Sequence, residues 1–338
     1  MNVVERVTAM LRIRRFEEQC IRLSKEGQFP GHYHVYIGQE PTAVAVCAAL
    51  AAEDFVYSTW RNHGHLLARG AAADRMMAEI LGKAGGYCGG RSGTLHLCVR
   101  ELGIPATSAL VGGSLPMATG GALACKRRGS GITAAFFGDA ALEEGAAYEA
   151  MIIAAVWKLP ILLVCENNSI PPQQRKRGQY TSSTLPAARL VDVPRSLQLP
   201  SEVVDGADAD ALSECFDRLT GEIRSGGGPR FVEVRCTRWP GNFPLWPDLP
   251  GGEWRLAWAF DQQAEHAELA AWLQESDPIL LYLRKLAAAG TLDRAQAEAI
   301  DARVRAEMSA AVQFALDSPQ PAPGDAFHHV WAQGGAAQ

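Results

Sequence analysis

The sequence predicts an α/β protein: a mostly parallel β-sheet with helices on both faces, preceded by an N-terminal helix and followed by a C-terminal helical extension. Short β-like runs alternate with helical runs along most of the 338 residues, and this alternation is typical of parallel sheets covered by helices. Apolar residues form 48% and charged residues 20% of the chain, which is enough apolar material for a sizeable core. Internal repeats and long linkers are absent from the sequence, so we expect a single domain over residues 1–338.

A helical arm is expected over residues 1–52. Apolar side chains recur at helical spacing from Val3 to Ile13, and Gly27 provides a signal that ends the helix. A second helical run, rich in alanine and valine, covers residues 42–52. The amphipathic N-terminus lacks the apolar segment and the cleavage site of a signal peptide, which favours a cytoplasmic location.

The sheet core is expected over residues 53–240. β-like runs lie at 55–59, 133–137, 161–165 and 230–236, and helical runs lie at 76–81, 116–126, 143–158 and 208–225. The helical extension follows over residues 253–319. A long polar loop lies at 169–184, and loops of this length often act as lids over functional sites.

Composition excludes several classes of protein. The 32 basic and 37 acidic residues give a net charge of −5, so no electrostatic attraction to nucleic acid or to an anionic membrane is expected. The longest apolar stretch, 150–165, is interrupted by Lys158 and Pro160, so we expect no transmembrane helix. The eight cysteines are scattered without a C-x-x-C pair, which argues against structural zinc, redox dithiols and a disulfide framework.

Two polar residues, Asp139 and Asn168, follow successive apolar runs that read as parallel strands. Because the carboxyl ends of such strands lie at one edge of the sheet, both side chains can converge on one ligand. A carboxylate, an amide oxygen and phosphate oxygens suit Mg²⁺, and the N-terminus of the following helix favours a diphosphate. An Asp that caps its helix and an Asn pair in a turn explain the same segment at least as simply.

Several motifs, in order along nearly the whole chain, favour the ligand site over the capping and turn interpretation. The segment 136–168 resembles the thiamine diphosphate motif, in which G-D-G is followed some 25–30 residues later by N-N. More broadly, the chain resembles the alpha subunits of the 2-oxo acid dehydrogenases of the pyruvate, branched-chain and acetoin types. The likeness rests on IRRFEE, HVYIGQE, STWRNHGHLLARG, GKAGGYCGGRSGTLH, ALVGGSLPMATGGALA, WKLPILLVCENN and VVDGAD.

The resemblance implies a parallel-sheet thiamine diphosphate-binding fold with a metal site and a diphosphate site. Mg²⁺ would be held by Asp139, Asn168 and the backbone carbonyl of Ile170. Arg61 and Arg238 would bind the diphosphate, for which the guanidinium fork is well shaped. The remaining implied cofactor contacts are Trp60, Ala109, Val111, Gly138 and Ala140.

The resemblance also assigns His63 a place close to the reactive end of the cofactor. An ordinary half-buried histidine is the simpler interpretation of a lone His, but His63 stands in the matched segment STWRNHGHLLARG. We therefore treat it as a candidate catalytic residue.

Three features depart from the family pattern: the G-D-G segment, the loop that follows the Asn pair and the segment after Arg238. Ala140 replaces the second glycine of G-D-G, and Glu143 replaces a usual asparagine. A carboxylate at Glu143 suits the helix N-terminus but repels a diphosphate unless it is turned away. Asn242 replaces the histidine that the family uses in acyl transfer, and an amide cannot exchange protons near neutral pH.

The function that the resemblance implies is decarboxylation of a pyruvate-like 2-oxo acid, followed by transfer of the activated acyl unit to an acceptor such as lipoamide on an acyltransferase. A beta subunit would supply the activating glutamate, in a heterotetramer of two alpha and two beta chains. Asn242 and the unusual 169–184 loop leave open a two-component carboligase that adds the acyl carbanion to an aldehyde or ketone. A non-catalytic regulatory or scaffold subunit is a third possibility, against which the retention of Asp139, Asn168, Arg61 and Arg238 argues.

Overall fold

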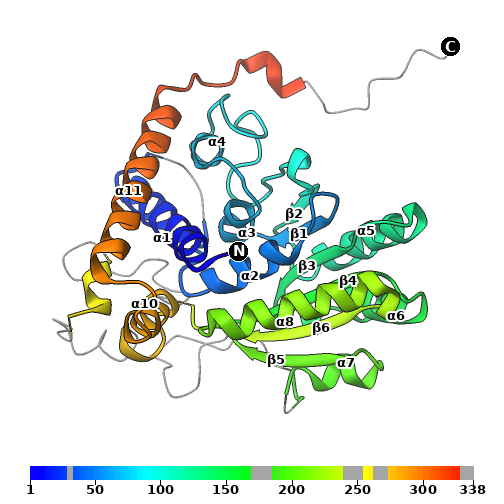
Figure 1. Ribbon diagram of the computed structural model, residues 1–338. Coiled ribbons are helices and arrows are strands. Elements are labelled where there is room, and N and C mark those ends of the chain that lie inside the picture. The colour runs from blue at the N-terminus through cyan, green and yellow to red at the C-terminus, as the bar shows by residue number, and fades with distance from the viewer. Residues whose placement is uncertain (29–32, 169–184, 188, 239–253, 262–272, 328–338) are drawn as a thin grey trace.

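A six-stranded, wholly parallel sheet forms the centre of the computed structural model, which describes residues 1–28, 33–168, 185–187, 189–238, 254–261 and 273–327. Its strand order is β2-β1-β3-β4-β6-β5, and Figure 1 shows the strands between two layers of helices. The predicted α/β class is therefore confirmed. The strands are β1 (Phe55–Thr59), β2 (Ala106–Ser108), β3 (Thr133–Gly138), β4 (Ile161–Asn167), β5 (Ser201–Asp205) and β6 (Arg230–Arg235).

Each face of the sheet has its own apolar core, because successive side chains of a strand point to opposite faces. In β3, Ala134 and Phe136 join one core, and Ala135 and Phe137 join the other. The first core is covered by α1 (Val3–Lys25), α2 (Glu40–Ala49), α3 (His63–Ala68) and α8 (Ala209–Glu222). The second is covered by α5 (Ser114–Arg128), α6 (Gly145–Val156) and α7 (Asp192–Ser196).

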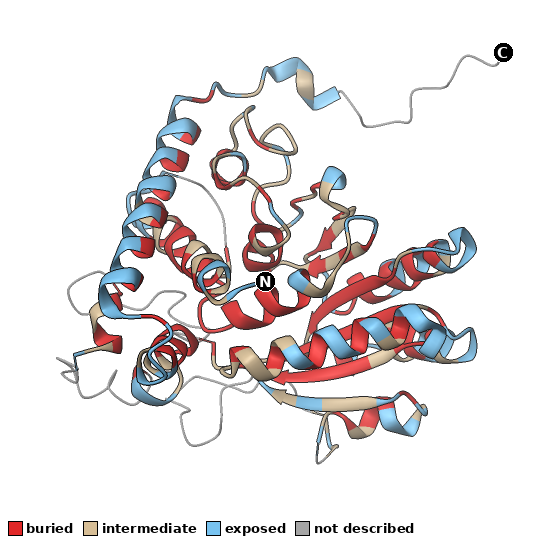
Figure 2. Ribbon diagram, viewed as in Figure 1, coloured by how far each residue is buried: buried red, intermediate tan, exposed pale blue. Residues whose placement is uncertain are grey.

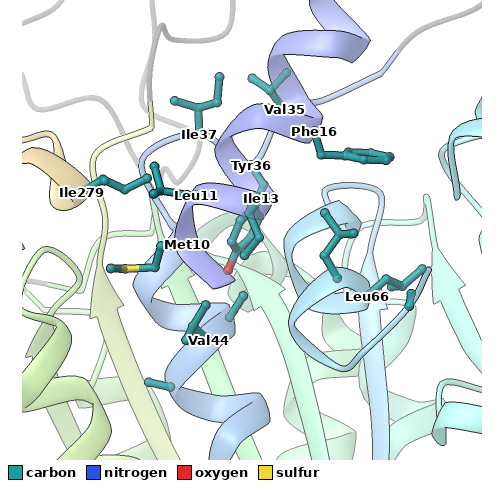
Figure 3. Close-up of a cluster of buried hydrophobic side chains, with 14 of the residues drawn as sticks. Met10, Leu11, Ile13, Phe16, Val35, Tyr36, Ile37, Val44, Leu66 and Ile279 are labelled. Carbon is teal, nitrogen blue, oxygen red and sulfur yellow. The ribbon is translucent and has the colours of Figure 1, made fainter. Parts of the chain in front are cut away.

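The first core reaches from the sheet into the N-terminal arm. Figure 3 shows the Tyr36 ring among apolar side chains of α1 and α2, including Leu11, Ile13 and Val44. All four residues are at most 1% exposed. Burial of this apolar surface stabilises the contact between arm and sheet, and it places the segment 33–39 against the strand ends.

The C-terminal helices pack on the arm and not on the sheet. Helix α11 (Arg294–Asp317) runs beside α1 and past α4 (Ala73–Ile80), whereas α10 (Pro278–Ala288) lies against α1 and α2 (Figure 1). Figure 2 shows α11 with one buried and one exposed face. The capping box of Asn2 and Glu5 begins α1, and a second one, Asp293 with Gln296, begins α11.

Two buried arginines tie the arm to the C-terminal segments. Arg14 Nη1 donates to Asp277 Oδ2 at 2.8 Å, and Arg15 Nη2 donates to Asp301 Oδ2 at 2.7 Å. Trp254 lies beside both, with each guanidinium carbon 4.8 Å from the centre of its ring. Each buried charge is thus paired and stacked, which removes most of the cost of burying it.

The structure differs from the sequence-based expectations at the edges of the sheet and in the C-terminal region. Strands β2 and β5 and helices α3 and α7 are additional to the predicted elements. Within the expected helical extension at 253–319, Asp277 caps α10 and a left-handed Gly290 ends the turn after it, so α10 and α11 are separate helices. Short 3₁₀ or π segments are η1 (Arg100–Leu102), η2 (Asp139–Glu143), η4 (Ile223–Gly227), η6 (Leu256–Ala259) and η7 (Pro323–Phe327). None of the described helices is long and apolar enough to span a membrane.

Candidate active site

The candidate site lies where β3 and β4 end side by side. In the register of this parallel pair, Gly138 of β3 is opposite Glu166 of β4. Asp139 follows Gly138 directly, and Asn168 follows the last residue of β4. The two residues singled out from the sequence therefore meet at one carboxyl edge of the sheet, as the parallel topology requires.

A cavity opens at this edge, and most of the predicted cofactor residues line it. Its wall includes Trp60, Arg61, Val111, Gly138, Asp139, Ala140, Asn168 and Arg238. Ala109 is half-buried outside this lining. Ile170 and Asn242 fall outside the described residues, so the predictions for these two positions stay predictions.

The cavity carries two buried guanidinium groups, those of Arg61 and Arg238, which are 8% and 9% exposed. Burial lowers the pKa of Arg61, and burial together with the positive charge of Arg61 lowers the pKa of Arg238 to about 10, against an opposing effect of Asp139. Arg238 therefore remains charged near neutral pH, as arginine side chains in proteins do in general. Two like charges in one buried site repel each other, and an anion between them would remove that penalty.

Arg238 also has unused hydrogen-bonding capacity. Its Nη1 donates to Asn168 Oδ1 at 3.4 Å, but Nε and Nη2 are buried and have no acceptor among the described residues. Buried donors without partners are rare in folded proteins and call for an explanation. The donor set, the burial and the charge all fit a diphosphate.

Asp139 and Asn168 supply the oxygens opposite this positive charge. Asp139 is 1% exposed and begins η2, whereas Glu144 is the N-cap of α6. Asp139 is therefore not the residue that caps α6, contrary to the simpler interpretation of the sequence. Asn168 Nδ2 donates to Gln39 Oε1 at 3.0 Å, which leaves its Oδ1 facing Arg238. A carboxylate and an amide oxygen at one edge are suitable ligands for Mg²⁺.

His63 is fully buried and does not belong to the lining of the cavity. Its Nδ1 is 3.0 Å from Glu17 Oε2 and its Nε2 is 2.6 Å from Thr94 Oγ1. Asn62, next in the chain, donates to the carbonyl oxygens of Thr59 and Thr94. These bonds fix the start of α3 and, with it, the preceding residue Arg61.

Glu166 is a site residue that the sequence reasoning missed. It is 3% exposed, lines the cavity, accepts a hydrogen bond from the Tyr36 hydroxyl and lies 3.2 Å from His65 Nε2. Burial and the charge of Glu166 raise the pKa of Tyr36, which keeps its phenol protonated. The available signal was the position of Glu166, a carboxylate at the end of an apolar strand immediately before the Asn pair.

Two of the residues that depart from the family pattern differ in their position at the cavity. Glu143 is exposed and does not belong to the lining. Ala140 lies in the wall of the cavity.

Comparisons with known proteins identify similar chains. Residues 8–243 match the family described as "Dehydrogenase E1 component". The chain is 34% identical to the alpha subunit of acetoin:2,6-dichlorophenolindophenol oxidoreductase from Bacillus subtilis (strain 168), over 95% of this chain and 91% of that protein. The corresponding protein of Cupriavidus necator is 33% identical, over 95% and 92% of the two chains. The pyruvate dehydrogenase E1 component subunit alpha of Rhizobium meliloti is 32% identical, over 92% and 85%.

Proposed function

The chain belongs to the dehydrogenase E1 component family, and from this premise we propose that it is the alpha subunit of an enzyme that uses thiamine diphosphate and Mg²⁺ to decarboxylate a pyruvate-like 2-oxo acid. The acyl unit would pass to an acceptor such as the lipoyl group of an acyltransferase. The relatives reported above are subunits of oxidoreductases and dehydrogenases, so the carboligase and the scaffold interpretations are not favoured.

The observation that carries the proposal is the buried pair Arg61 and Arg238. Their charges face one cavity, and Arg238 holds two buried donors without an acceptor in the described structure. A diphosphate would accept these hydrogen bonds and neutralise the repulsion between the two guanidinium groups. Trp60 lies in the same wall, and its indole N–H is a further donor for a phosphate oxygen.

For the metal we propose Asp139 and Asn168 as side-chain ligands and the carbonyl of Ile170 as the third protein ligand. Mg²⁺ would be held by these oxygens and would offset the negative charge of Asp139. An amide oxygen has two lone pairs, so Asn168 Oδ1 could hold the ion while it still accepts from Arg238 Nη1.

When bound, thiamine diphosphate would supply a nucleophilic carbon and an electron sink for loss of carbon dioxide. The residues of this chain hold it, orient it and limit access of water. We propose that His63 acts as a positioning residue, because Glu17 and Thr94 already engage both of its ring nitrogens. Through α3 it keeps Arg61 in place. Asn242, which cannot transfer protons, would contribute hydrogen bonding alone at the acyl-transfer step.

We further propose that the chain works with a beta subunit that supplies the activating glutamate, in a heterotetramer of two alpha and two beta chains. The outer surface of α6 supports association with another chain, since Ile152, Ile153, Val156 and Trp157 are 37–71% exposed there. Exposed large apolar side chains grouped on one helix are typical of protein interfaces.

The test combines the purified chain with a candidate beta subunit, thiamine diphosphate and Mg²⁺. A panel of 2-oxo acids and acetoin is offered, and carbon dioxide release, reduction of 2,6-dichlorophenolindophenol and acyloin formation are measured. We expect dye reduction coupled to carbon dioxide release with at least one 2-oxo acid. Acyloin formation without dye or lipoamide reduction would support a carboligase instead. Absence of cofactor binding and of all three activities would refute an enzymatic role.

A further inference from the structure

Two cysteines, Cys88 and Cys98, lie together in the segment that connects α4 to β2. Both are half-exposed, whereas the other six cysteines are buried. Cys88 Sγ donates to the carbonyl oxygen of Cys98, ten positions further along the chain, at 3.6 Å, and Cys98 Sγ donates to the carbonyl oxygen of His96 at 3.4 Å. The loop thus brings together two cysteines that show no motif in the sequence.

The loop is held in this shape by the carboxylate of Glu79, which is fully buried. Glu79 Oε2 accepts from the backbone N–H of Cys88 at 2.7 Å and of Gly90 at 2.9 Å. Glu79 Oε1 accepts from the N–H of Ser92 at 2.8 Å. A carboxylate that accepts several charge-assisted hydrogen bonds fixes the local backbone strongly. The position of Cys88 near Cys98 is therefore set by a buried group.

Gly90 makes the turn of this loop possible. Its φ is +77°, and a Cβ at this position would lie 2.5 Å from the backbone of Gly82. Only glycine combines the left-handed conformation with such a close approach. On the other side, Val99 pairs with Ile104 in a β-bridge, which anchors the residue next to Cys98.

The two thiols differ in acidity. The hydrogen bond from the Cys98 thiol stabilises the Cys88 thiolate and lowers the pKa of Cys88 to about 6, although burial and the charge of Glu79 oppose this effect. The pKa of Cys98 is raised, because its proton is held by the Cys88 sulfur and because it is partly buried. One sulfur is therefore a nucleophile at neutral pH, and its neighbour is a protonated thiol.

We propose that Cys88 and Cys98 are an oxidisable pair that forms a reversible disulfide on exposure to peroxides. Cys88 sulfur attacks one peroxide oxygen; an S–O bond forms, the O–O bond breaks, and the other oxygen leaves as water after taking up a proton. Cys88 is thereby oxidised to a sulfenic acid by two electrons, and the peroxide is reduced. The Cys98 sulfur then attacks Cys88, the S–O bond breaks, and the Cys98 proton leaves with the hydroxide as water.

The disulfide can be detected by peptide mapping of the purified full-length chain. The protein is treated with hydrogen peroxide, its remaining thiols are blocked with N-ethylmaleimide, and it is digested with trypsin without reduction. Cleavage after Lys83, Arg91 and Arg100 places each sulfur on its own peptide, 84–91 or 92–100. We expect these peptides to be recovered linked, with the mass of their sum less two hydrogens, and to separate again after dithiothreitol.

A control with unfolded protein and three variants test the role of the fold and of each sulfur. When the chain is unfolded in concentrated urea, peroxide should link Cys88 and Cys98 no more often than other cysteine pairs. Cys98→Ser should leave a sulfenic acid on Cys88 that dimedone traps, and Cys88→Ser should slow oxidation of Cys98 by about tenfold or more. Cys215→Ser, at a buried cysteine on α8, should leave the yield of linked peptide unchanged.

The proposal would be overturned if the two peptides are recovered unlinked after the peroxide is consumed, each with its cysteine either alkylated or oxidised without a partner. Equal oxidation rates of Cys98 in the wild type and in Cys88→Ser would contradict the assignment of Cys88 as the attacking sulfur. Neither readout depends on cofactor binding or on a partner subunit, so the outcome is independent of the proposed enzymatic function.

Discussion

Arg238 Nη1 donates to Asn168 Oδ1 across 3.4 Å and so joins a proposed diphosphate-binding residue to a proposed metal ligand. The contact is possible because β4 and β6 are neighbours and run parallel, with Asn167 opposite Arg235. Residues just beyond the two strand ends therefore lie close together, although 70 positions separate them in the chain. The anion and the cation of the proposed cofactor complex would be bound as one unit.

Arg238→Ala should weaken thiamine diphosphate binding by about a hundredfold, the equivalent of two charge-assisted hydrogen bonds. Arg238→Lys should recover part of the loss, because it restores the charge without the planar fork. Isothermal titration of the assembled protein with thiamine diphosphate at saturating Mg²⁺ measures both effects. Arg218→Ala, which removes an exposed arginine of α8, is the matched control. An affinity unchanged by Arg238→Ala would refute the diphosphate assignment.

Asp139→Ala should abolish the Mg²⁺ dependence of cofactor binding, since it removes the only carboxylate of the proposed ligand set. Titration with thiamine diphosphate is repeated at increasing Mg²⁺, and again after removal of the metal with a chelator. The wild type should lose affinity on chelation, whereas the variant should bind weakly at every Mg²⁺ concentration. Glu149→Ala, at an exposed position on α6, should behave like the wild type. A variant that still responds fully to Mg²⁺ would show that the metal is held elsewhere.

Asn242→His should change acyl transfer more than decarboxylation. The substitution introduces a group that titrates near neutral pH at the place where the family uses histidine. Transfer to lipoamide and reduction of 2,6-dichlorophenolindophenol, compared in the same preparation, separate the two steps. We expect the ratio of lipoamide transfer to dye reduction to rise, with a new dependence on pH between about 6 and 7. Parallel changes in both rates would argue against this role.

Trp254→Phe should lower the free energy of unfolding by about 2 kcal/mol. Trp254 Nε1 donates to Asp277 Oδ2 at 2.7 Å, and the ring stacks with Arg14 and Arg15. Phenylalanine keeps much of the ring contact but leaves Asp277 without this donor. Trp157→Phe, at a tryptophan that is 49% exposed, should change stability by less than about 0.5 kcal/mol. Chemical denaturation of both variants decides whether the buried indole anchors the C-terminal helices.

Asp301→Asn should remove stability that depends on pH. Burial alone would raise the pKa of Asp301, but hydrogen bonds and charge from Arg15 and Arg305 lower it below its ordinary value. A carboxyl whose pKa is lower in the folded state stabilises the fold above its unfolded pKa of about 3.9, and this stabilisation is lost as the pH falls through the folded pKa.

The difference in unfolding free energy between the wild type and Asp301→Asn should therefore be about 3 kcal/mol at pH 6 and shrink below pH 4 or so. Urea unfolding measured from pH 6 downward provides the comparison. Asp317→Asn, on an exposed part of the same helix, should give a small difference that does not vary with pH in this way. A difference for Asp301→Asn that stays constant over the whole range would contradict the assigned ion pair.

Local pattern was sufficient for the inner strands β1, β3 and β4. Strand β1 has the bounds expected from its apolar run, and β3 and β4 extend the expected strands by one and two residues at their ends. The edge strands β2 and β5 could not be found in this way. β5 has no fully buried residue, and its apolar content is limited to Val203 and Val204. This run is too short to predict a strand, and pairing with β6 defines it.

The sequence by itself determined the family, the parallel α/β class and the pair Asp139 and Asn168, because each depends on motifs or on strand ends that are local in the chain. Only the tertiary structure placed Glu166 against Tyr36, His63 against Glu17, and Cys88 against Cys98. These contacts join segments that share no periodicity, and folding favours them because most polar groups that a chain buries are paired. The buried Nε and Nη2 donors of Arg238, which lack an acceptor among the described residues, are also a property of the fold, because they depend on which groups surround the guanidinium.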